Sequence, residues 1–299
     1  MMEYPAILDE LGRGAPKDLS TVGGGSIADA AVASFDNGSK VFVKRAADDS
    51  RLSGRMFECE AQGLRALGDV GALRVPEVLA VSEDALVLEF IEQGSKTGDF
   101  FVDFGRNFAL MHQQRGKVCG FAHDNFIGST PQQNAPLEGT WDEAEDGGGL
   151  DWPRFFIERR LRFQVELAEH NGHGSELTDL LDRSEAAIGE LLGADIEQPS
   201  LLHGDLWGGN YLVDGHGRAC LIDPAVYYGH READLAMTRL FGGFNHEFYA
   251  AYDEAWPLVH GWQDRLPVYQ LYHLLNHLNL FGSAYYDRSK SILDRLARQ

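Results

Sequence analysis

The sequence has little positive charge, with only six lysines. Lysine and arginine together number 26 against 46 aspartates and glutamates, which gives a formal net charge of -20. Because a surface this acidic repels phosphate backbones and anionic headgroups, we expect neither a nucleic-acid-binding nor a membrane-binding protein. A site for an anionic ligand such as a nucleotide must create its own positive field, from a lysine, a metal ion or backbone N–H groups.

Cysteine is also scarce, and long apolar runs are missing. Cys59, Cys119 and Cys220 are isolated from one another. This spacing offers neither a disulfide framework nor a zinc pattern, and it is typical of a reducing compartment. No uninterrupted apolar stretch approaches the length of a membrane span, and the beginning of the chain lacks the pattern of a signal peptide. We therefore expect a cytoplasmic protein.

The chain has a β-rich beginning and a largely helical remainder. Residues 36–38 (Asp-Asn-Gly) separate two β-prone runs and predict a hairpin with a type I′ turn, whose two central positions need positive φ. Apolar spacing predicts a helix over residues 56–67, and strands follow at 76–80 and 85–91. Further helices are expected at residues 100–112, 152–170, 176–192, 232–241, 248–256 and 267–280. The pattern predicts an α+β fold with a boundary near residues 92–98.

The strongest motif is His-Gly-Asp-Leu-Trp-Gly-Gly-Asn at residues 203–210. Asp205 and Asn210 have the spacing of the protein-kinase catalytic loop, H-R-D-L-x-x-x-N. A predicted hairpin then folds the chain back and brings Asp223 beside Asn210, where the two oxygen donors suit Mg²⁺. Asp205 can orient a substrate hydroxyl for phosphoryl transfer. Asp and Asn often only cap turns, but the three residues together favour a kinase site.

A lysine and a glutamate follow in the order that kinases use to bind phosphates. Lys44 alternates with apolar residues on a predicted strand, and the next helix carries Glu58 and Glu60. Because Glu60 shares a helix face with Leu64 and Leu67, we favour Glu60 over Glu58 as the partner of Lys44. A strand lysine alone is more often a solvated edge residue, so it is the order of the elements that favours this role.

Two weaker signals concern the nucleotide. Gly24, Gly25 and Ser26 belong to a glycine-rich turn whose backbone N–H groups could face phosphates, although the turn does not match G-x-G-x-x-G. Glu89 and Ile91 end the last strand of the β-rich part, where backbone groups could bind an adenine or simply form a linker.

Other candidate sites have less support. His273 and His277 are one helical turn apart, but they lack the glutamate of H-E-x-x-H and lie among leucines and aromatic residues. We therefore expect packed helix histidines rather than a metal pair. The sequence also contains no G-x-S-x-G motif and no Cys-His nucleophile arrangement.

These motifs together resemble the fructosamine kinase (ketosamine-3-kinase) family, in the aminoglycoside-phosphotransferase-like branch of the protein-kinase-like fold. The resemblance runs over nearly the whole chain. Its most specific stretches are HGDLWGGN (203–210), LIDPAVYYGHREADLAM (221–237) and QLYHLLNHLNLFG (270–282). The resemblance implies a bilobal α+β fold, with a small β-rich lobe at residues 1–92 and a larger, mainly helical lobe at residues 93–299.

The resemblance also implies the chemistry. ATP would bind in the cleft with Lys44 on its phosphates, Mg²⁺ would bind Asn210 and Asp223, and Asp205 would be the catalytic base. The implied substrates are ketoamines, the Amadori products of sugars and amines, phosphorylated at the sugar C3 hydroxyl. Because such a product breaks down and frees the amine, the implied role is deglycation.

Family motifs further imply positions near the sugar. These are Asp124, Asn125, Trp207, Tyr228, His230 and Arg231. Asp234 is expected to be structural, as an acid at a helix start that holds the catalytic loop. Ser26 stands where some family members carry a cysteine, so we expect no redox-sensitive loop.

Two alternatives remain open. A kinase for another small hydroxyl substrate, such as an aminoglycoside, choline or homoserine, would share the H-G-D…N…D pattern. A non-catalytic nucleotide-binding module is disfavoured because Lys44, Asp205, Asn210 and Asp223 are all retained. The expected partner is a small-molecule or protein-bound ketoamine, and the expected state is a monomer or weak homodimer.

Overall fold

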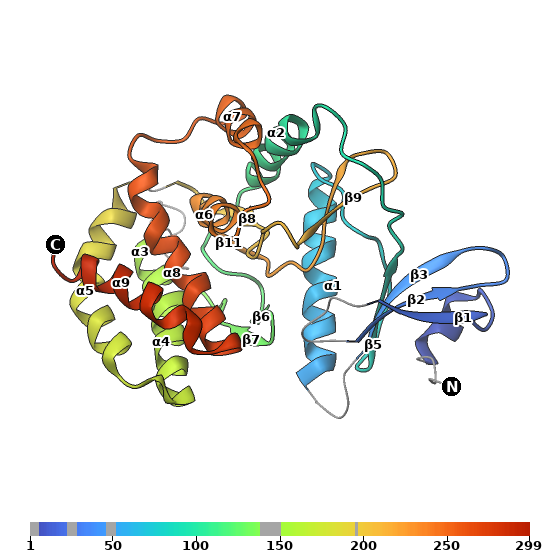
Figure 1. The fold of residues 1–299 in the computed structure, drawn as a ribbon, viewed down its shortest axis with the longest axis horizontal. Coiled ribbons are helices and arrows are strands. Elements are labelled where there is room, and N and C mark those ends of the chain that lie inside the picture. Colours follow the sequence, from blue (N-terminus) through green and yellow to red (C-terminus); the bar gives the residue numbers. More distant parts are fainter. Residues whose placement is uncertain (1–5, 23–28, 46–51, 138–150, 195–196) are drawn as a thin grey trace.

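An antiparallel sheet of five strands lies within the first third of the chain (Figure 1). The computed structural model describes residues 6–22, 29–45, 52–137, 151–194 and 197–299. The strand order is β1–β2–β3–β5–β4, with a bulge between β4 and β5. The strands are β1 (Asp18–Val22), β2 (Asp29–Ser34), β3 (Lys40–Arg45), β4 (Val78–Val81) and β5 (Ala85–Glu89). A short 3-10 helix (Ala6–Leu11) packs against this sheet, and its buried Ile7 and Leu8 join the sheet core.

The β2–β3 hairpin closes differently from the sequence prediction. Gly38 has a φ of 80°, whereas Asn37 does not have positive φ. The Gly38 N–H donates to the Phe35 carbonyl at 2.9 Å, and the Phe35 N–H donates to the Ser39 carbonyl at 3.0 Å. This is a three-residue loop with glycine in the left-handed position, so the predicted type I′ turn is wrong. The Asn37 side chain accepts the Ser39 N–H at 2.9 Å, an Asx-type contact that stabilises the alternative turn.

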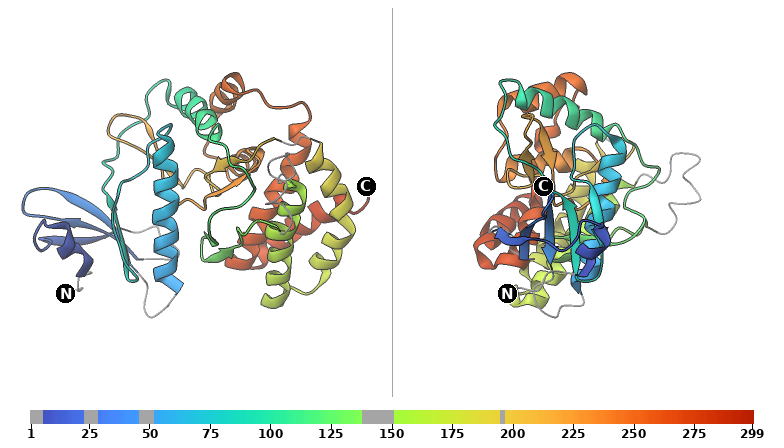
Figure 2. Two further views of the ribbon diagram at one scale, coloured as in Figure 1. Left: turned by 180° about the vertical axis from the view of Figure 1, so that it is seen from behind. Right: turned by 90° about the vertical axis from the view of Figure 1, so that its right-hand side faces the viewer.

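Helix α1 (Leu52–Val70) lies between the sheet and the rest of the molecule (Figures 1 and 2). Its buried Phe57 and Leu64 pack on Leu86 of β5. The helix also contacts β6 (Asn125–Ile127), which belongs to the second part of the chain. Because α1 touches both parts, its side chains can reach the space between them.

Short two-stranded ribbons connect the sheet to the helices. β9 (Tyr211–Val213) pairs with β10 (Ala219–Leu221), and β8 (Ser200–Leu202) pairs with β11 (Tyr227–Gly229). A third ribbon joins β6 to β7 (Thr130–Gln132). Because β8 and β11 are neighbours, the loop that follows β8 starts beside the end of the segment that leads into β11.

Helices make up the remainder. They are α2 (Phe100–His112), α3 (Trp152–Phe156), α4 (Phe163–Ala168), α5 (Glu176–Gly193), α6 (Glu232–Leu240), α7 (His246–Ala255), α8 (Trp262–Phe281) and α9 (Tyr286–Leu296). Two π-helical turns (Ile157–Arg162 and Glu169–His173) join α3, α4 and the start of α5, and a 3-10 turn (Ser283–Tyr285) precedes α9. α2 packs against α7, and α6 packs against α8 (Figure 1). The largest core cluster includes Trp152, Phe156 and Tyr269.

The predicted α+β fold, with a β-rich first lobe and a helical second lobe, is confirmed. α2 has the predicted bounds, whereas α8 begins at Trp262 and not at the predicted Pro267. Pro267 is the sixth residue of α8, so it removes one backbone hydrogen bond to the first turn, and the helix continues through it. The boundary near residue 92 stays a prediction. No helix among the described residues is long and apolar enough to cross a membrane.

Candidate active site

A buried carboxylate on α6 anchors the loop of residues 203–210. Asp234 accepts the His203 N–H at 2.7 Å and the Gly204 N–H at 2.8 Å, and His112 of α2 lies 3.1 Å from it through Nε2. Burial alone would raise the pKa of Asp234, but these donors lower it below its usual value. Asp234 is therefore ionised, and the prediction that it holds the catalytic loop is confirmed.

His203 and Gly204 determine the path of this loop. The Asp205 N–H donates to His203 Nδ1 at 3.3 Å, and His203 Nε2 lies 3.0 Å from the Ile222 carbonyl. A single neutral tautomer satisfies both contacts, and burial lowers the pKa of His203 accordingly. Gly204 has a φ of 82°, and a Cβ there would lie 2.0 Å from the Ala225 carbonyl oxygen. Only glycine fits this position.

Asp205 lies at the centre of the loop and binds Asn210. The Asn210 amide nitrogen donates to the Asp205 carbonyl at 2.8 Å and to its carboxylate at 3.2 Å. Burial, and then the negative charge of Asp223, raises the pKa of Asp205 well above its usual value, although Asn210 opposes the shift. A carboxylate with raised proton affinity is well suited to accept a proton from a substrate.

Lys44 reaches across from β3 to Asp223. Its Nζ lies 2.5 Å from Asp223 Oδ1 and 2.6 Å from Glu60 Oε1. Burial alone would lower the pKa of Lys44, but the two carboxylates outweigh it and raise the pKa above its usual value. Lys44 is therefore protonated and supplies a positive charge in an acidic protein. Glu60, rather than the exposed Glu58, is its partner on α1.

Asp223 has an unusual backbone conformation. Its φ of 55° is the only positive φ of a non-glycine residue in the described ranges. A left-handed non-glycine residue costs about 1–2 kcal/mol, and such strain concentrates at functional sites. The Ile222 N–H donates to the Asn210 carbonyl at 3.1 Å, so a backbone hydrogen bond holds Asn210 next to the residue that precedes Asp223.

Asn210 and Asp223 fit the requirements of Mg²⁺. Asn210 commits its amide nitrogen to Asp205, so its side-chain oxygen is the atom suited to a cation. Asp223 adds an anionic oxygen from a side chain that is 43% exposed. In the part of the chain that the structure describes, no group of three or more His, Cys, Asp and Glu side chains could hold a metal. A cation here would therefore depend on water and phosphate oxygens for its other ligands, as Mg²⁺ commonly does.

Trp207 gives the same loop an exposed aromatic wall. Its side chain is 39% exposed and lies edge-on to Phe241, with 6.3 Å between ring centroids. Gly209 makes room for it, because a Cβ there would lie 2.5 Å from the indole, and the preceding Gly208 lies against Gly243 of the next loop. An exposed indole two residues from Asp205 offers a stacking surface for a sugar.

Two residues expected near the sugar have internal partners instead. Arg231 is 1% exposed, donates twice to Glu197 and also donates to the Trp256 carbonyl. Asn125 is buried, and its amide nitrogen donates to the Val226 carbonyl at 2.7 Å. These hydrogen bonds use most of the polar atoms of both side chains. Both side chains are thus committed to internal contacts, and their expected place near the sugar stays a prediction.

The other three sugar candidates differ in exposure. His230 is buried, and its ring lies parallel to that of Tyr269 with 6.2 Å between the centroids, so its place near the sugar also stays a prediction. Asp124 is partly exposed, and one carboxylate oxygen accepts the Asn134 N–H at 2.7 Å. Tyr228 is partly exposed and covers Gly116, where a Cβ would lie 2.6 Å from the ring. Asp124, Tyr228 and Trp207 are therefore the more accessible of the six candidates.

The structure describes only some of the residues that we expect at the nucleotide. Gly24, Gly25 and Ser26 lie outside the described residues. Glu89 donates its N–H to the Glu77 carbonyl and binds Arg74 through its carboxylate, so its carbonyl oxygen is what it can offer an adenine. Ile91 is buried just beyond β5, and its role at an adenine stays a prediction.

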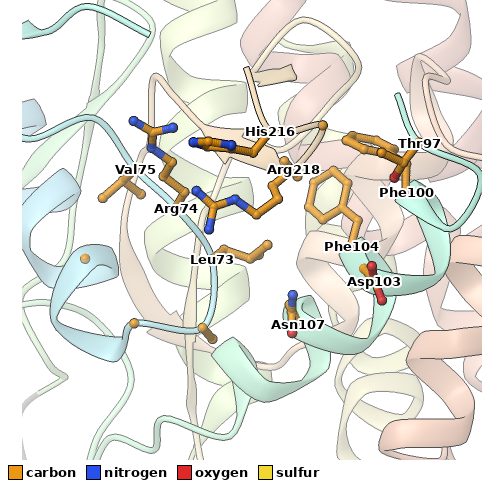
Figure 3. A pocket seen from close by; sticks show the side chains of 15 residues that line it. Leu73, Arg74, Val75, Thr97, Phe100, Asp103, Phe104, Asn107, His216 and Arg218 are labelled. Carbon is orange, nitrogen blue, oxygen red and sulfur yellow. The ribbon is translucent and has the colours of Figure 1, made fainter. Parts of the chain in front are cut away.

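A separate cavity of about 630 Å³ lies away from these residues (Figure 3). Its walls come from the end of α1 and the following segment, the start of α2, and the β9–β10 hairpin. Arg74 and Arg218 face Phe100 and Phe104 across it (Figure 3). None of the residues that converge on Asp205 lines this cavity, so it is not the active site.

One histidine lies closer to Asp205 than the sequence suggested. The helical spacing of His273 and His277 predicted packing, and both are in the interior of α8. His273 Nδ1, however, lies 3.9 Å from Asp205 Oδ1. Helical periodicity places a residue on a face, but it does not show which loop that face meets, so this contact could not be predicted from the sequence.

Comparison with known proteins identifies the family. The family model described as fructosamine kinase matches residues 5–299. The chain belongs to the fructosamine kinase family. The protein-ribulosamine 3-kinase of Oryza sativa subsp. indica is 40% identical over 287 residues, which cover 94% of this chain and 79% of the rice protein. The corresponding enzyme of Arabidopsis thaliana is 37% identical over 94% of this chain and 82% of its own length.

Solved structures agree with this family assignment. A crystal structure from Thermobifida fusca assigned to the fructosamine-3-kinases has a TM-score of 0.82 and 30% identity, covering 99% of this chain and 100% of that one. A choline kinase from Streptococcus pneumoniae has a TM-score of 0.58 at 15% identity, over 98% of both chains. The second likeness shows a shared protein-kinase-like fold. As a fructosamine kinase family member, the protein is a phosphotransferase of the kinase type.

Proposed function

We propose that this fructosamine kinase family member transfers the γ-phosphoryl group of ATP to the C3 hydroxyl of a ketoamine, with Mg²⁺ as its metal ion. The observation that carries the proposal is the convergence of Lys44, Asp205, Asn210 and Asp223 on one site. The rice relative, a protein-ribulosamine 3-kinase, supports the substrate class. Exposed Trp207 supports a sugar-sized acceptor beside Asp205.

Each side chain has a defined task in this reaction. Lys44, held charged between Glu60 and Asp223, would bind phosphate oxygens. Asn210 and Asp223 would hold Mg²⁺, which when bound neutralises charge on the β- and γ-phosphates. Asp205 orients the acceptor hydroxyl and takes its proton late, because phosphoryl transfer has a loose transition state with little bonding to the nucleophile.

The first prediction separates binding from chemistry at Asp205. Asp205→Asn keeps the size and polarity of the side chain but removes the carboxylate that receives the proton. We expect ATP affinity close to that of the parent, because Lys44, Asn210 and Asp223 are unchanged. Ketoamine phosphorylation should fall by roughly 10²–10⁴-fold, the range of general acid–base groups. Calorimetric titration with Mg·ATP beside a turnover assay measures both quantities, and a parallel loss of nucleotide affinity would place Asp205 in the ATP site.

The substrate class is tested with a panel. Fructosyl-, ribulosyl- and erythrulosyl-amines are compared side by side with an aminoglycoside and with choline as phosphate acceptors. We expect transfer to the ketoamines, with the phosphate on C3 by NMR of the product. Preferred transfer to the aminoglycoside or to choline would contradict the proposed substrate and leave the kinase chemistry intact.

A further inference from the structure

The neighbourhood of Asp205 contains a buried polar atom without a partner. His273, in the middle of α8, is 3% exposed, and its Nδ1 has no hydrogen bond with any described residue. A buried polar atom left unpaired costs about 1–3 kcal/mol, so native structures rarely retain one without a functional reason. The unpaired nitrogen of His273 therefore needs an explanation.

The carboxylate of Asp205 lies close to this nitrogen. The 3.9 Å between His273 Nδ1 and Asp205 Oδ1 is too long for a direct hydrogen bond. Two atoms at this separation can, however, each make an ordinary hydrogen bond of about 2.8 Å to one oxygen placed between them. The separation of the two atoms therefore suits one hydroxyl oxygen that is hydrogen-bonded to both.

The protonation states suit such an oxygen. His273 is neutral, because burial and then the neighbouring His277 lower its pKa to about 3. A neutral imidazole has one N–H donor and one lone pair, whereas the carboxylate form of Asp205, the form that can take up a proton, only accepts. If Nδ1 has the hydrogen, an oxygen between the two groups accepts from His273 and donates its own hydrogen to Asp205.

We propose that His273 Nδ1 binds the substrate hydroxyl that is phosphorylated, and thereby holds its oxygen against Asp205. This inference rests on the proposed ketoamine kinase function and adds a substrate-binding residue to it. The hydroxyl would donate its hydrogen to Asp205 and accept the N–H of His273 with one lone pair, which leaves the other lone pair for phosphorus. As the new P–O bond forms and the bond to ADP breaks, the hydroxyl proton passes to Asp205.

The test uses two variants that differ in one donor. Asn and Leu have nearly the same size, so His273→Asn and His273→Leu change the packing equally. The Asn amide nitrogen is one bond from Cγ, as Nδ1 is, whereas Leu has only a methyl group there. Dissociation constants are measured for a ketoamine and for its 3-deoxy analogue, in the presence of a non-hydrolysable ATP analogue. The ratio of the two constants cancels any general damage to the site.

We expect the parent and His273→Asn to prefer the 3-hydroxy compound to a similar extent. In His273→Leu this preference should fall by about tenfold, which corresponds to one lost hydrogen bond. Equal preferences in the Asn and Leu variants would overturn the proposal. If His273→Leu does not fold, His273→Gln replaces it, because its amide lies one bond further out and should also lose the preference.

Failure of the proposed function would look different. In that case the parent protein itself would not transfer phosphate to ketoamines, whatever the variants do. A parent that phosphorylates ketoamines, together with variants of unchanged hydroxyl preference, would reject only the role of His273.

Discussion

At the scale of single residues, Gly204 shows how little space the catalytic loop leaves. A Cβ at this position would meet the Ala225 carbonyl oxygen at 2.0 Å, and the φ of 82° disfavours any other residue. We expect Gly204→Ala to destabilise the fold by about 3 kcal/mol or more, because overpacking and backbone strain add. Urea unfolding measures the loss, and activity should fall with it because Asp205 is the next residue.

The matched control is a helical glycine. Gly189 lies within α5, has no positive φ, and a Cβ there meets nothing within 4 Å. Gly189→Ala should therefore stabilise the protein by roughly 0.5–1 kcal/mol through helix propensity alone. If both alanine variants shifted stability alike, the close contact at Gly204 would not be the cause.

At the scale of elements, Arg74 joins three of them. It follows α1, binds Glu89 of β5 at 2.6 Å, and binds Asp214 of the β9–β10 turn at 2.7 Å. Asp214 is fully buried, and burial alone would raise its pKa, but the Arg218 and His216 N–H groups and Arg74 lower it below its usual value. This joint, the two ion pairs of Arg74 with Glu89 and Asp214, links the β-rich lobe to the hairpin that leads to Asp223.

We expect Arg74→Met to destabilise the protein by about 1–3 kcal/mol, since it removes one partner of a buried carboxylate. The control is Arg106→Met, whose ion pairs with Asp103 and Glu254 are exposed and 3.8 Å long. That change should stay within about 0.5 kcal/mol. Denaturant titrations of both variants compare the losses, and equal losses would show that the joint is no stronger than a surface pair.

The sequence predicted the elements better than the contacts between them. Apolar periodicity located α2 and α5 within a residue, because it depends only on local spacing. The motif at residues 203–210 predicted Asp205 and Asn210, whose contact is also local. The internal partners of Arg231 and the joint at Arg74 depend on residues that are distant along the chain, such as Glu197 and Asp214. No pattern in a single sequence reports such pairs.

At the scale of the whole molecule, buried histidines set the response to acid. Burial lowers the pKa of four of them: His112, His203, His273 and His277. Below about pH 6.5 these four side chains therefore bind more protons in the unfolded chain than in the folded one, and this makes the free energy of unfolding fall as pH falls. For His273 this window extends from about 6.5 down to about 3.

We expect the free energy of unfolding to decrease between pH 7 and pH 5, by up to about 1.4 kcal/mol per pH unit for each fully shifted histidine. Two effects act in the opposite direction. Protonation relieves the self-repulsion of a net charge of -20, and the raised pKa of Asp205 lets the folded protein bind a proton more tightly than the unfolded chain does. Guanidinium titrations at several pH values decide between them. His273→Asn should reduce the slope of the free energy of unfolding against pH by about one proton. A stability that rises toward pH 5 would show that the opposing effects dominate.

The exposed indole of Trp207 has an optical consequence. Trp207 is more than a third exposed, whereas Trp152 is buried in the largest core cluster. A sugar that stacks on Trp207 displaces water from the ring, and indole emission moves to shorter wavelength when water leaves. We expect ketoamine binding to shift the intrinsic fluorescence of the protein, and Trp207→Phe to abolish the shift. The protein would thus report on its own occupancy without a dye, and substrate association could be followed in real time by stopped-flow mixing.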